Sequence, residues 1–478
     1  MRHTYKLISL FVIGLALSAC KVVSPPAESD TLEIPTQFIH TSDSSQYGGA
    51  VPWKEFFTDE HLQNLIAEAI LNNPDQKIAI QRVDVARAGV RIAKGAMLPS
   101  VEATITGGQQ RFGKYTMDGV GNFDTNFSPN INEDQRMAEH LPDYHTALLS
   151  SWEIDLWGKL RNQKRAAAAR LLATEQGRQL VATTLVAEVA RNYYELVTLD
   201  NELLIIEKNI QLQERALEVV RAQKEAGRAT ELAVKQFTAQ LIHTRVLDVD
   251  IRQRIFSVET TINFLLGRFN QPVVRNQSIL LQPLPQKINS GIPAQMLRHR
   301  PDILQAELQM QAAHFNVLAA RSAFMPSLNI TAAWGLQSFD VSKWLNPASL
   351  TYGLFGGLTA PIFYRNQLKA EFQRANAEQR EALYTFQKAV LLGYQEVITN
   401  LNQINALQTS SQLKQQEVTV LSEGVATSND LYIAGMASYL EVITAQKSVL
   451  EAELQLTETR KAQFFTMINL YRALGGGW

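Results

Sequence analysis

The chain has 478 residues, of which 45 are basic and 46 acidic, and its formal net charge at pH 7 is −1. This balance excludes a basic field for nucleic acid and an acidic solvating tail, and the length suffices for a large core or for two or three domains. Hydrophobic residues make up 46% of the sequence, as in ordinary globular proteins. Beyond the N-terminus, no stretch offers the ~18 consecutive apolar residues of a membrane helix.

The N-terminus has the pattern of an export signal. A basic start is followed by an apolar run (Leu7–Leu17) and the letters LSAC, which is too short for a stable membrane span. The segment resembles a bacterial lipoprotein signal, which implies lipidation of Cys20; an ordinary signal peptide with a stray thiol is the alternative. Lys21, where an aspartate would favour the inner membrane, implies an outer-membrane lipoprotein of a Gram-negative cell. Because Cys20 is the only cysteine, internal disulfides are excluded.

The rest of the chain reads as a duplication. The segment 73–100 aligns without gaps with the segment 300–327 at an offset of 227 residues, and further along an offset of 208 residues brings Gly227 onto Gly435. Matches that stay in register over so long a stretch indicate an internal repeat. The chain is therefore predicted to divide into a signal peptide, a lipidated extension, a first repeat, a linker and a second repeat, with bounds at 1–19, 20–58, 59–270, 271–298 and 299–475.

Both repeats are predicted to contain the same elements in the same order. Apolar residues at helical spacing predict helices over 75–97 and 302–324, each ended by a proline. Alternating β-prone residues predict one strand directly after each helix and another at 144–157 and 350–363. Proline-free helical patterns follow, and the stretch 160–225 alone would form a helix of about 100 Å at ~1.5 Å per residue. Such a polar helix is a coiled-coil rod or a stave of a helical barrel.

The four predicted strands are too few to form a closed β-barrel in a membrane. Their length, about 10 residues or slightly more, is what a tilted outer-membrane strand needs, and bulky aromatic residues lie near them. A small soluble sheet with an aromatic cluster is the alternative. Four strands cannot close a barrel, and an open sheet edge cannot lie in lipid. A barrel shared between several chains solves this, and three copies would supply twelve strands, although periodicity alone does not fix the number three.

A family resemblance rests on the lipoprotein signal, the duplicated strand pairs and the segments WEIDLWGKLRN, RPDILQAELQMQAA, FMPSLNIT and AGMASYLEVITAQ. Together they resemble the TolC/OprM-type outer membrane efflux factors over about residues 50–475. The resemblance implies a mainly α fold with a membrane β-barrel: a homotrimer whose 12-strand outer-membrane barrel continues into a long periplasmic α-helical barrel. The linker would lie in a belt around the tube, in its equatorial region.

The function implied by this resemblance is that of a passive exit duct. It would conduct small molecules such as drugs, detergents or bile-salt-like amphiphiles from an inner-membrane efflux pump and a periplasmic membrane-fusion adaptor to the exterior. The chain would be anchored in outer-membrane lipid and would reach into the periplasm. The resemblance implies neither a cofactor nor an enzymatic activity, and the sequence leaves the cargo and the class of pump open.

Two turns between long helices are the first candidate sites. Glycine in each turn suits the left-handed residue at which one helix ends and the next begins, so a plain helix hairpin is the simplest interpretation. By resemblance the turns are also the periplasmic tips that meet the adaptor. The adaptor-contact residues predicted there are Gly227, Arg228, Gly435 and Met436.

The resemblance also places an iris-like gate near these tips. Three copies of one glutamate around a narrow axis would repel anions and attract a cation, whereas a solvated helical glutamate is the simpler alternative. Ala233, Ala437 and Thr444 depart from charged residues that some family members have at these positions. The predicted gate residues are Glu441, Tyr432, Asp430 and Glu231.

Other functions have weaker support. No HExxH, Walker or GxSxG motif occurs in the sequence, so an enzyme is not predicted. His140 and His145 lie close together in sequence but form no ligand set, and no metal site is predicted. A structural coiled-coil outer-membrane lipoprotein and a periplasmic adaptor without a channel are the alternatives. Neither explains two strand pairs at matching positions of a repeat.

Overall fold

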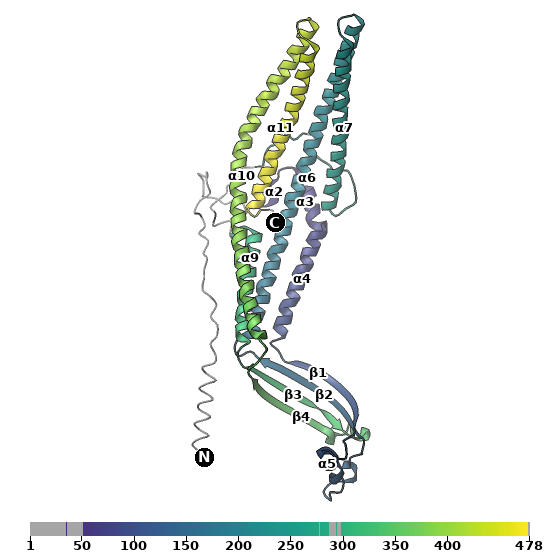
Figure 1. Ribbon diagram of the computed structural model, residues 1–478, viewed down its shortest axis with the longest axis vertical. Coiled ribbons are helices and arrows are strands. Elements are labelled where there is room, and N and C mark those ends of the chain that lie inside the picture. Colours follow the sequence, from purple (N-terminus) through teal and green to yellow (C-terminus); the bar gives the residue numbers. More distant parts are fainter. Residues whose placement is uncertain (1–34, 36–50, 277, 286–292, 294–297, 477–478) are drawn as a thin grey trace. The chain divides into compact units, whose positions relative to one another are not determined.

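A computed structural model describes residues 35, 51–276, 278–285, 293 and 298–476 (Figure 1). The predicted signal peptide, Cys20 and part of the predicted linker lie outside the described residues. None of the helices in the described part is long and apolar enough to cross a membrane. The chain forms two compact units, and most of the long helices pass from one unit to the other along the sequence.

The helices of the two repeats have equal lengths. The first helix of each repeat has 22 residues, the second has 67 and the third has 35. The first two pairs are α4 (Pro74–Gly95) with α9 (Pro301–Ser322) and α6 (Lys159–Glu225) with α10 (Gln367–Ile433). The third pair is α7 (Glu231–Leu265) with α11 (Tyr439–Ala473), and two short helices precede α4, namely α2 (Trp53–Phe56) and α3 (Glu60–Asn72).

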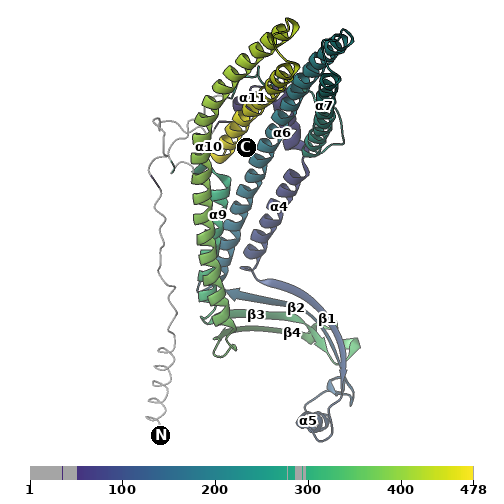
Figure 2. The same cartoon turned by 45° about the horizontal axis from the view of Figure 1, so that its top comes forward.

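One unit contains a four-stranded antiparallel sheet in the order β1-β2-β3-β4. The strands are β1 (Ser100–Gln110), β2 (Leu141–Ile154), β3 (Ser327–Ser338) and β4 (Leu350–Thr359). Each strand pairs with its neighbour in the sequence, and Figure 2 shows that the strands bend along their length. Strands β1 and β4 are the two edges of this sheet, and neither edge is paired within the described part of the chain.

The ends of two strands differ from the prediction. Strand β2 ends before Asp155, whose carboxylate accepts hydrogen bonds from the backbone N–H groups of Leu160 (3.1 Å) and Arg161 (2.9 Å). The residue therefore caps the start of α6 and cannot continue the strand. Strand β4 ends at Thr359, just before Pro361, because a proline has no N–H group for the ladder.

The stretch between β1 and β2 holds a helix that the sequence did not predict. Helix α5 (Met117–Thr125) begins after Thr116, whose hydroxyl accepts a hydrogen bond from the N–H of Gly119 at 3.1 Å. Its two glycines have low helix propensity, and its polar residues leave no clear apolar spacing from which a helix could be predicted. Two 3₁₀ turns, η3 (Val341–Lys343) and η4 (Pro347–Ser349), occupy the shorter stretch between β3 and β4.

The other unit is built from two helical hairpins. Helix α7 runs back along α6, and α11 runs back along α10 (Figures 1 and 2). Its apolar core includes α3 and the middle of α6, together with the ends of α7 and α11. The ring of Tyr471 stacks on Phe56 with centroids 4.2 Å apart, and its hydroxyl donates to the carbonyl of Val51 at 2.6 Å. Residues at both ends of the described chain thus share one core.

A matched contact ties the first and third helices of each repeat. In repeat 1, Asn73 Nδ2 donates to the carbonyl of Leu265 at 2.9 Å. At the corresponding place in repeat 2, Arg300 Nη1 donates to the carbonyl of Ala473 at 2.8 Å. Both bonds satisfy a carbonyl at a helix C-terminus, which has no partner inside its own helix. The duplication therefore preserves the contact and changes the residue that makes it.

Candidate functional site

The first tip is the turn between α6 and α7. Gly227 has φ +76°, and the next residue, Arg228, donates its N–H to the carbonyl of Gln223 at 2.8 Å. This is the helix-ending motif that a left-handed glycine permits. Thr230 then caps α7 by accepting a hydrogen bond from the N–H of Ala233 at 3.2 Å. The tip is a rigid turn whose apex, including Arg228, is exposed.

The second tip, between α10 and α11, repeats this geometry. Gly435 has φ +75°, and Met436 donates its N–H to the carbonyl of Leu431 at 2.8 Å. The Met436 side chain is 74% exposed. Ser438 stands where Thr230 stands in the first tip, at the start of α11. The apex of the second tip therefore presents one exposed apolar side chain beside the turn.

The predicted gate residues lie in different surroundings. Glu441 is exposed, and its carboxylate accepts a hydrogen bond from the N–H of Ser438 at 2.7 Å, as the third residue of a capping box. Glu231 pairs with Lys224 and, at 3.5 Å, with Lys235. The hydrogen bond and charge of Lys224 hold the pKa of Glu231 below its usual range. Glu441 has no cation of this kind among the described residues.

The other two predicted gate residues differ in burial. Tyr432 is half-buried and packs against a small apolar cluster that both hairpins share. Burial raises the pKa of its phenol. Asp430, by contrast, is exposed at the end of α10. The apolar cluster joins the two tips through Phe237 of α7 and Val442 of α11, which are 2% and 1% exposed. The structure thus brings Tyr432 and Glu441 close to one contact between the hairpins.

The sheet has one apolar and one polar face. Side chains alternate along a strand, so the pairing of the strands assigns each residue to a face. One face carries exposed apolar side chains, among them Val101, Ile105, Trp334, Leu354 and Leu358. The opposite face carries mainly small and polar residues, among them Glu102, Thr104, Ser151, Thr331 and Gln337. This is the alternation of a strand with lipid on one side and water on the other.

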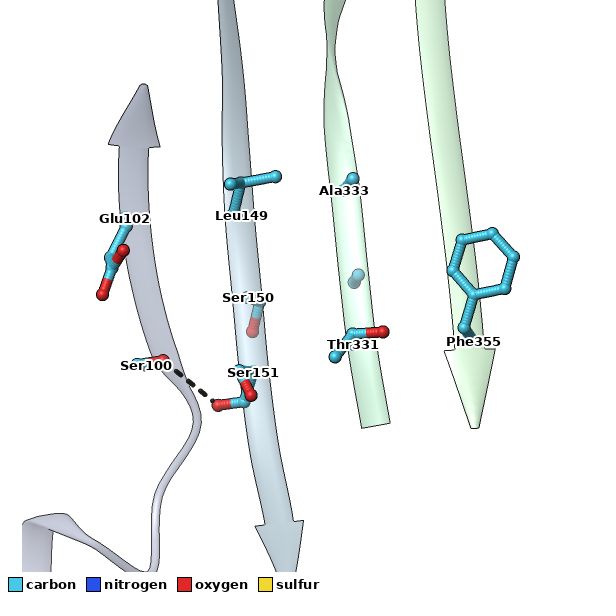
Figure 3. A pocket seen from close by; sticks show the side chains of 9 residues that line it. Ser100, Glu102, Leu149, Ser150, Ser151, Thr331, Ala333 and Phe355 are labelled. Carbon is cyan, nitrogen blue, oxygen red and sulfur yellow. Dashed lines mark hydrogen bonds between the residues drawn. The ribbon is translucent and has the colours of Figure 1, made fainter. Parts of the chain in front are cut away.

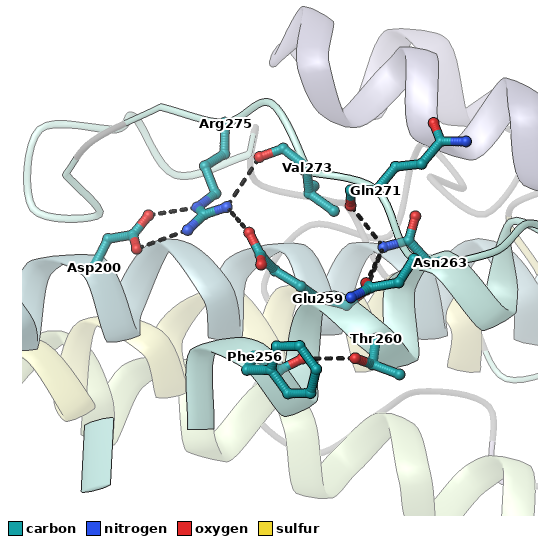
Figure 4. A network of polar contacts seen from close by, with 9 residues as sticks. Asp200, Phe256, Glu259, Thr260, Asn263, Gln271, Val273 and Arg275 are labelled. Carbon is teal, nitrogen blue, oxygen red and sulfur yellow. Dashed lines mark hydrogen bonds and ion pairs between the residues drawn. The ribbon is translucent and has the colours of Figure 1, made fainter. Parts of the chain in front are cut away.

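A network of ionic contacts fixes the start of the predicted linker (Figure 4). Arg275 binds Asp200 of α6 in a two-pronged contact, with Nη2 3.0 Å from Oδ1, and also binds Glu259 of α7. Its Nη1 donates in addition to the carbonyl of Val273 at 2.9 Å. The guanidinium is largely buried between its partners. The sequence predicted a linker at this place but gave no sign of the contacts that Arg275 makes with α6 and α7.

A second charged cluster joins α6, α7 and α11. Glu202 is 3% exposed, and its carboxylate lies 3.6 Å from Arg254 Nη1. Burial, and next the charge of Glu458, raise the pKa of Glu202 to about 7. Lys461 lies between Glu458 (2.7 Å) and Glu195 (3.0 Å). No group of three or more His, Cys, Asp or Glu side chains in the described part is arranged to hold a metal ion.

The long helices and the sheet with one apolar and one polar face agree with the family that the sequence matches. A family model described as outer membrane efflux protein matches residues 65–268 and 292–476. The chain belongs to the outer membrane efflux protein family. This confirms the resemblance to TolC/OprM-type efflux factors. Members of the family are channels of efflux systems and not enzymes, so the chain is an outer-membrane efflux channel component.

Individual relatives match over nearly their whole length. The pyoverdine export outer membrane protein OpmQ of Pseudomonas aeruginosa is 30% identical over 99% of this chain and 97% of its own. The cation efflux system protein CusC of Escherichia coli O6:H1 is 28% identical over 98% of both chains. The efflux family therefore accounts for the described chain from end to end.

Solved structures of efflux family members share the fold. A crystal structure of CusC matches with a TM-score of 0.81 at 25% identity, covering 95% of this chain and 100% of that one. The open state of the MtrE outer membrane channel of Neisseria gonorrhoeae matches with a TM-score of 0.82 at 22% identity, covering 95% and 98%. The predicted fold class, long helices with two strands per repeat, is confirmed.

Proposed function

We propose that three copies of this efflux-family chain form one exit duct through the outer membrane. The observation that carries the proposal is the sheet, with one apolar face, one polar face and free edges at β1 and β4. An edge in lipid leaves backbone N–H and C=O groups without partners, each at a cost of several kcal/mol. Pairing β4 of one copy with β1 of the next removes these edges, and three copies close a barrel of twelve strands.

The cargo is proposed to be small amphiphilic molecules such as drugs, detergents or bile-salt-like compounds. CusC and OpmQ carry the names of cation efflux and pyoverdine export, respectively, and both names refer to small solutes. A polar inner face favours passage of hydrated molecules without fixing their identity. Transport through the duct is passive, and an inner-membrane pump would supply both the energy and the selection.

The tips are proposed to form the adaptor contact and the gate. The two fixed turns present Gly227, Arg228, Gly435 and Met436 to a periplasmic membrane-fusion adaptor. Next to them, Glu441 and Tyr432 are proposed to narrow the tube, with Asp430 and Glu231 as further charges of this gate. The exposure of Met436 leaves it accessible to a partner, and the apolar cluster shared by the hairpins supports a contact between them at the level of the gate.

The N-terminus and the linker complete the proposal. Cys20 would be lipidated in the outer membrane after removal of residues 1–19, and residues 20–58 would connect the anchor to the first repeat. The linker 271–298 would belong to a belt around the helical tube, between repeats 59–270 and 299–475. The clamp of Arg275 on two helices supports a fixed position for the start of this belt.

Native mass spectrometry of the purified protein in detergent tests the trimer. We expect a particle with three copies of the 53.5 kDa chain, less its signal peptide and with its lipid. A folded monomer would contradict the closed barrel and would favour the alternative of a structural coiled-coil lipoprotein or an adaptor.

A further inference from the structure

Apart from His145 of β2, the four strands have only carboxylates as side chains that can carry a charge near neutral pH. Within their described residues there is no lysine or arginine. The acidic residues of the strands are Glu102, Asp143 and Glu153. The strand pairing places all three on the polar face of the sheet. Glu102 lies opposite Leu149, and along β2 Asp143 comes six residues before Leu149 and Glu153 four residues after it, both even spacings. The apolar face has no charged residue within these strands.

The three carboxylates differ in their partners. Glu153 lies 2.7 Å from Lys159 Nζ, which compensates its charge. Asp143 accepts a hydrogen bond from Gln337 Nε2 at 2.9 Å. Glu102 is exposed and has no ion-pair partner among the described residues. Of the three, Glu102 is therefore the carboxylate that neither an ion pair nor a side-chain hydrogen bond of the described chain engages.

The side chains that surround Glu102 in the described chain carry no positive charge. Glu102 is one of the residues that line a groove of about 420 Å³ on the sheet, and Figure 3 shows these side chains. The groove is lined by hydroxyls and apolar groups, including Ser100, Ser151, Thr331 and Phe355. Hydroxyl groups can orient toward a passing solute, but they carry no net charge. A channel whose low-dielectric wall carries one sign of charge concentrates ions of the opposite sign.

We propose that Glu102 makes the strand-lined part of the duct prefer cationic over anionic solutes. The inference rests on the proposed trimeric duct, in which three copies of Glu102 would ring the lumen. It locates a filter within the barrel, apart from the gate at the helix tips. Metal cations and amphiphiles with an ammonium group would pass this ring more readily than anionic amphiphiles of the same size, so that within the proposed cargo cationic drugs are favoured over bile-salt-like anions.

A single reporter thiol tests the proposal at the site itself. Ser151→Cys places a thiol on the same face, at the position diagonal to Glu102, where residues are about 7–8 Å apart and their Cβ atoms somewhat closer. The backbone carbonyl of Ser151 accepts the Ser100 hydroxyl at 3.2 Å, and this bond does not need the Ser151 side chain. Cys20 is the only natural cysteine and would be blocked by its lipid. Cationic and anionic methanethiosulfonates of similar size are added to intact cells, and the ratio of their reaction rates is measured.

The rate ratio separates the charge of Glu102 from other effects. We expect Glu102→Gln to lower the cationic-to-anionic ratio by about three- to tenfold, as for one charge at this distance in a largely aqueous site. A change in the acidity of the thiol affects both reagents alike and cancels in the ratio. The matched control is Asp118→Asn, which removes an exposed carboxylate from α5 outside the sheet and should leave the ratio unchanged.

Two results would overturn the proposal in distinguishable ways. A thiol that reacts with both reagents at a ratio unaffected by Glu102→Gln would refute the filter and leave the duct intact. A thiol that reacts with neither reagent in folded protein, but with both after denaturation, would show that the polar face is not lined by water. That second result would remove the proposed duct along with the filter.

Discussion

At the residue scale, Glu441 makes an observed helix-capping contact and has a proposed role in the gate, and one substitution can separate the two. Its carboxylate accepts a hydrogen bond from the N–H of Ser438 and so stabilises the start of α11. The corresponding residue of the other tip is Ala233, where only the Thr230 cap remains. The two tips thus share one backbone turn and differ in charge. A gate built on Glu441 would draw its charge from one hairpin of each copy.

Glu441→Gln should remove the charge and keep the cap, because glutamine also serves as the third residue of a capping box. We expect thermal stability to change little, by less than about 0.5 kcal/mol. The preference for cations in bilayer recordings should weaken, as measured by the reversal potential across a salt gradient. Glu231→Gln on the other tip should weaken the preference less, because Lys224 and Lys235 already offset part of its charge. If the reversal potential stays unchanged, the gate lies elsewhere, and Asp430→Asn is the next variant.

Arg300 and Asn73 occupy matching positions in the two repeats, but we expect their loss to lower the stability of the folded protein by different amounts. The side chain of Arg300 is 8% exposed and binds Asp302 at 2.7 Å and Glu396 at 2.8 Å, in addition to the carbonyl of Ala473. Arg300→Ala leaves Asp302 without its cation, whereas Glu396 keeps Arg472 at 3.1 Å, and should destabilise the protein by about 3 kcal/mol, the lower end for a broken buried pair. Asn73→Ala removes neutral hydrogen bonds and should cost about 1–3 kcal/mol. Chemical denaturation of the two variants in detergent checks the order, and equal losses would contradict it.

At the element scale, the two faces of the sheet should respond differently to one added charge. Leu354 is 73% exposed on the apolar face, and Thr331 is exposed on the polar face. A lysine on a lipid-facing strand costs about 2–4 kcal/mol at mid-membrane. Leu354→Lys should therefore lower the yield of folded oligomer in outer membranes, whereas Thr331→Lys should be tolerated. Heat-resistant oligomer on gels measures this, and the opposite order would reverse the assignment of the faces.

Glu202, at the contact between α6, α7 and α11, should make the free energy of unfolding depend on pH. The pKa of Glu202 is raised to about 7 in the folded protein, from an ordinary value of 4.5. The folded state thus keeps a proton that the unfolded state loses, so this group's contribution to stability falls as pH rises from 4.5 to about 7. Glu202→Gln mimics the protonated form. It should match the wild type near pH 5 and exceed it by about 2 kcal/mol at pH 8.

Melting temperatures at several pH values check this expectation. The control is Glu195→Gln, because Glu195 pairs with Lys461 at 3.0 Å and its loss should not stabilise the protein at high pH. A constant difference between Glu202→Gln and the wild type from pH 5 to 8 would show that Glu202 does not titrate in this range.

At the scale of the whole molecule, periodic patterns predicted more than isolated residues did. The repeat offset, the prolines and the helical spacing predicted the long helices and both strand pairs, because these signals add up over many residues. Helix α5 was not predicted, because its glycines and polar residues weaken the helical pattern over its nine positions. The Arg275 clamp joins residues far apart in the sequence, which no local pattern reveals.

Some contacts at the tips and helix ends could be predicted from the sequence and others could not. The letters SYLE at 438–441 are a capping-box signal, so the bond between Glu441 and Ser438 was open to prediction from sequence. The clamps of Asn73 and Arg300 were not, since unlike residue types make the same contact in the two repeats. A gate or an adaptor contact forms between chains, and a single chain supplies only one side of it.

Single-channel recording of the purified protein in planar bilayers tests the central claim most directly. A trimeric duct predicts discrete conductance steps whose size grows with salt concentration and which favour cations. Folded oligomer that produces no steps at any salt concentration would contradict a water-filled duct and would favour a structural lipoprotein without a channel.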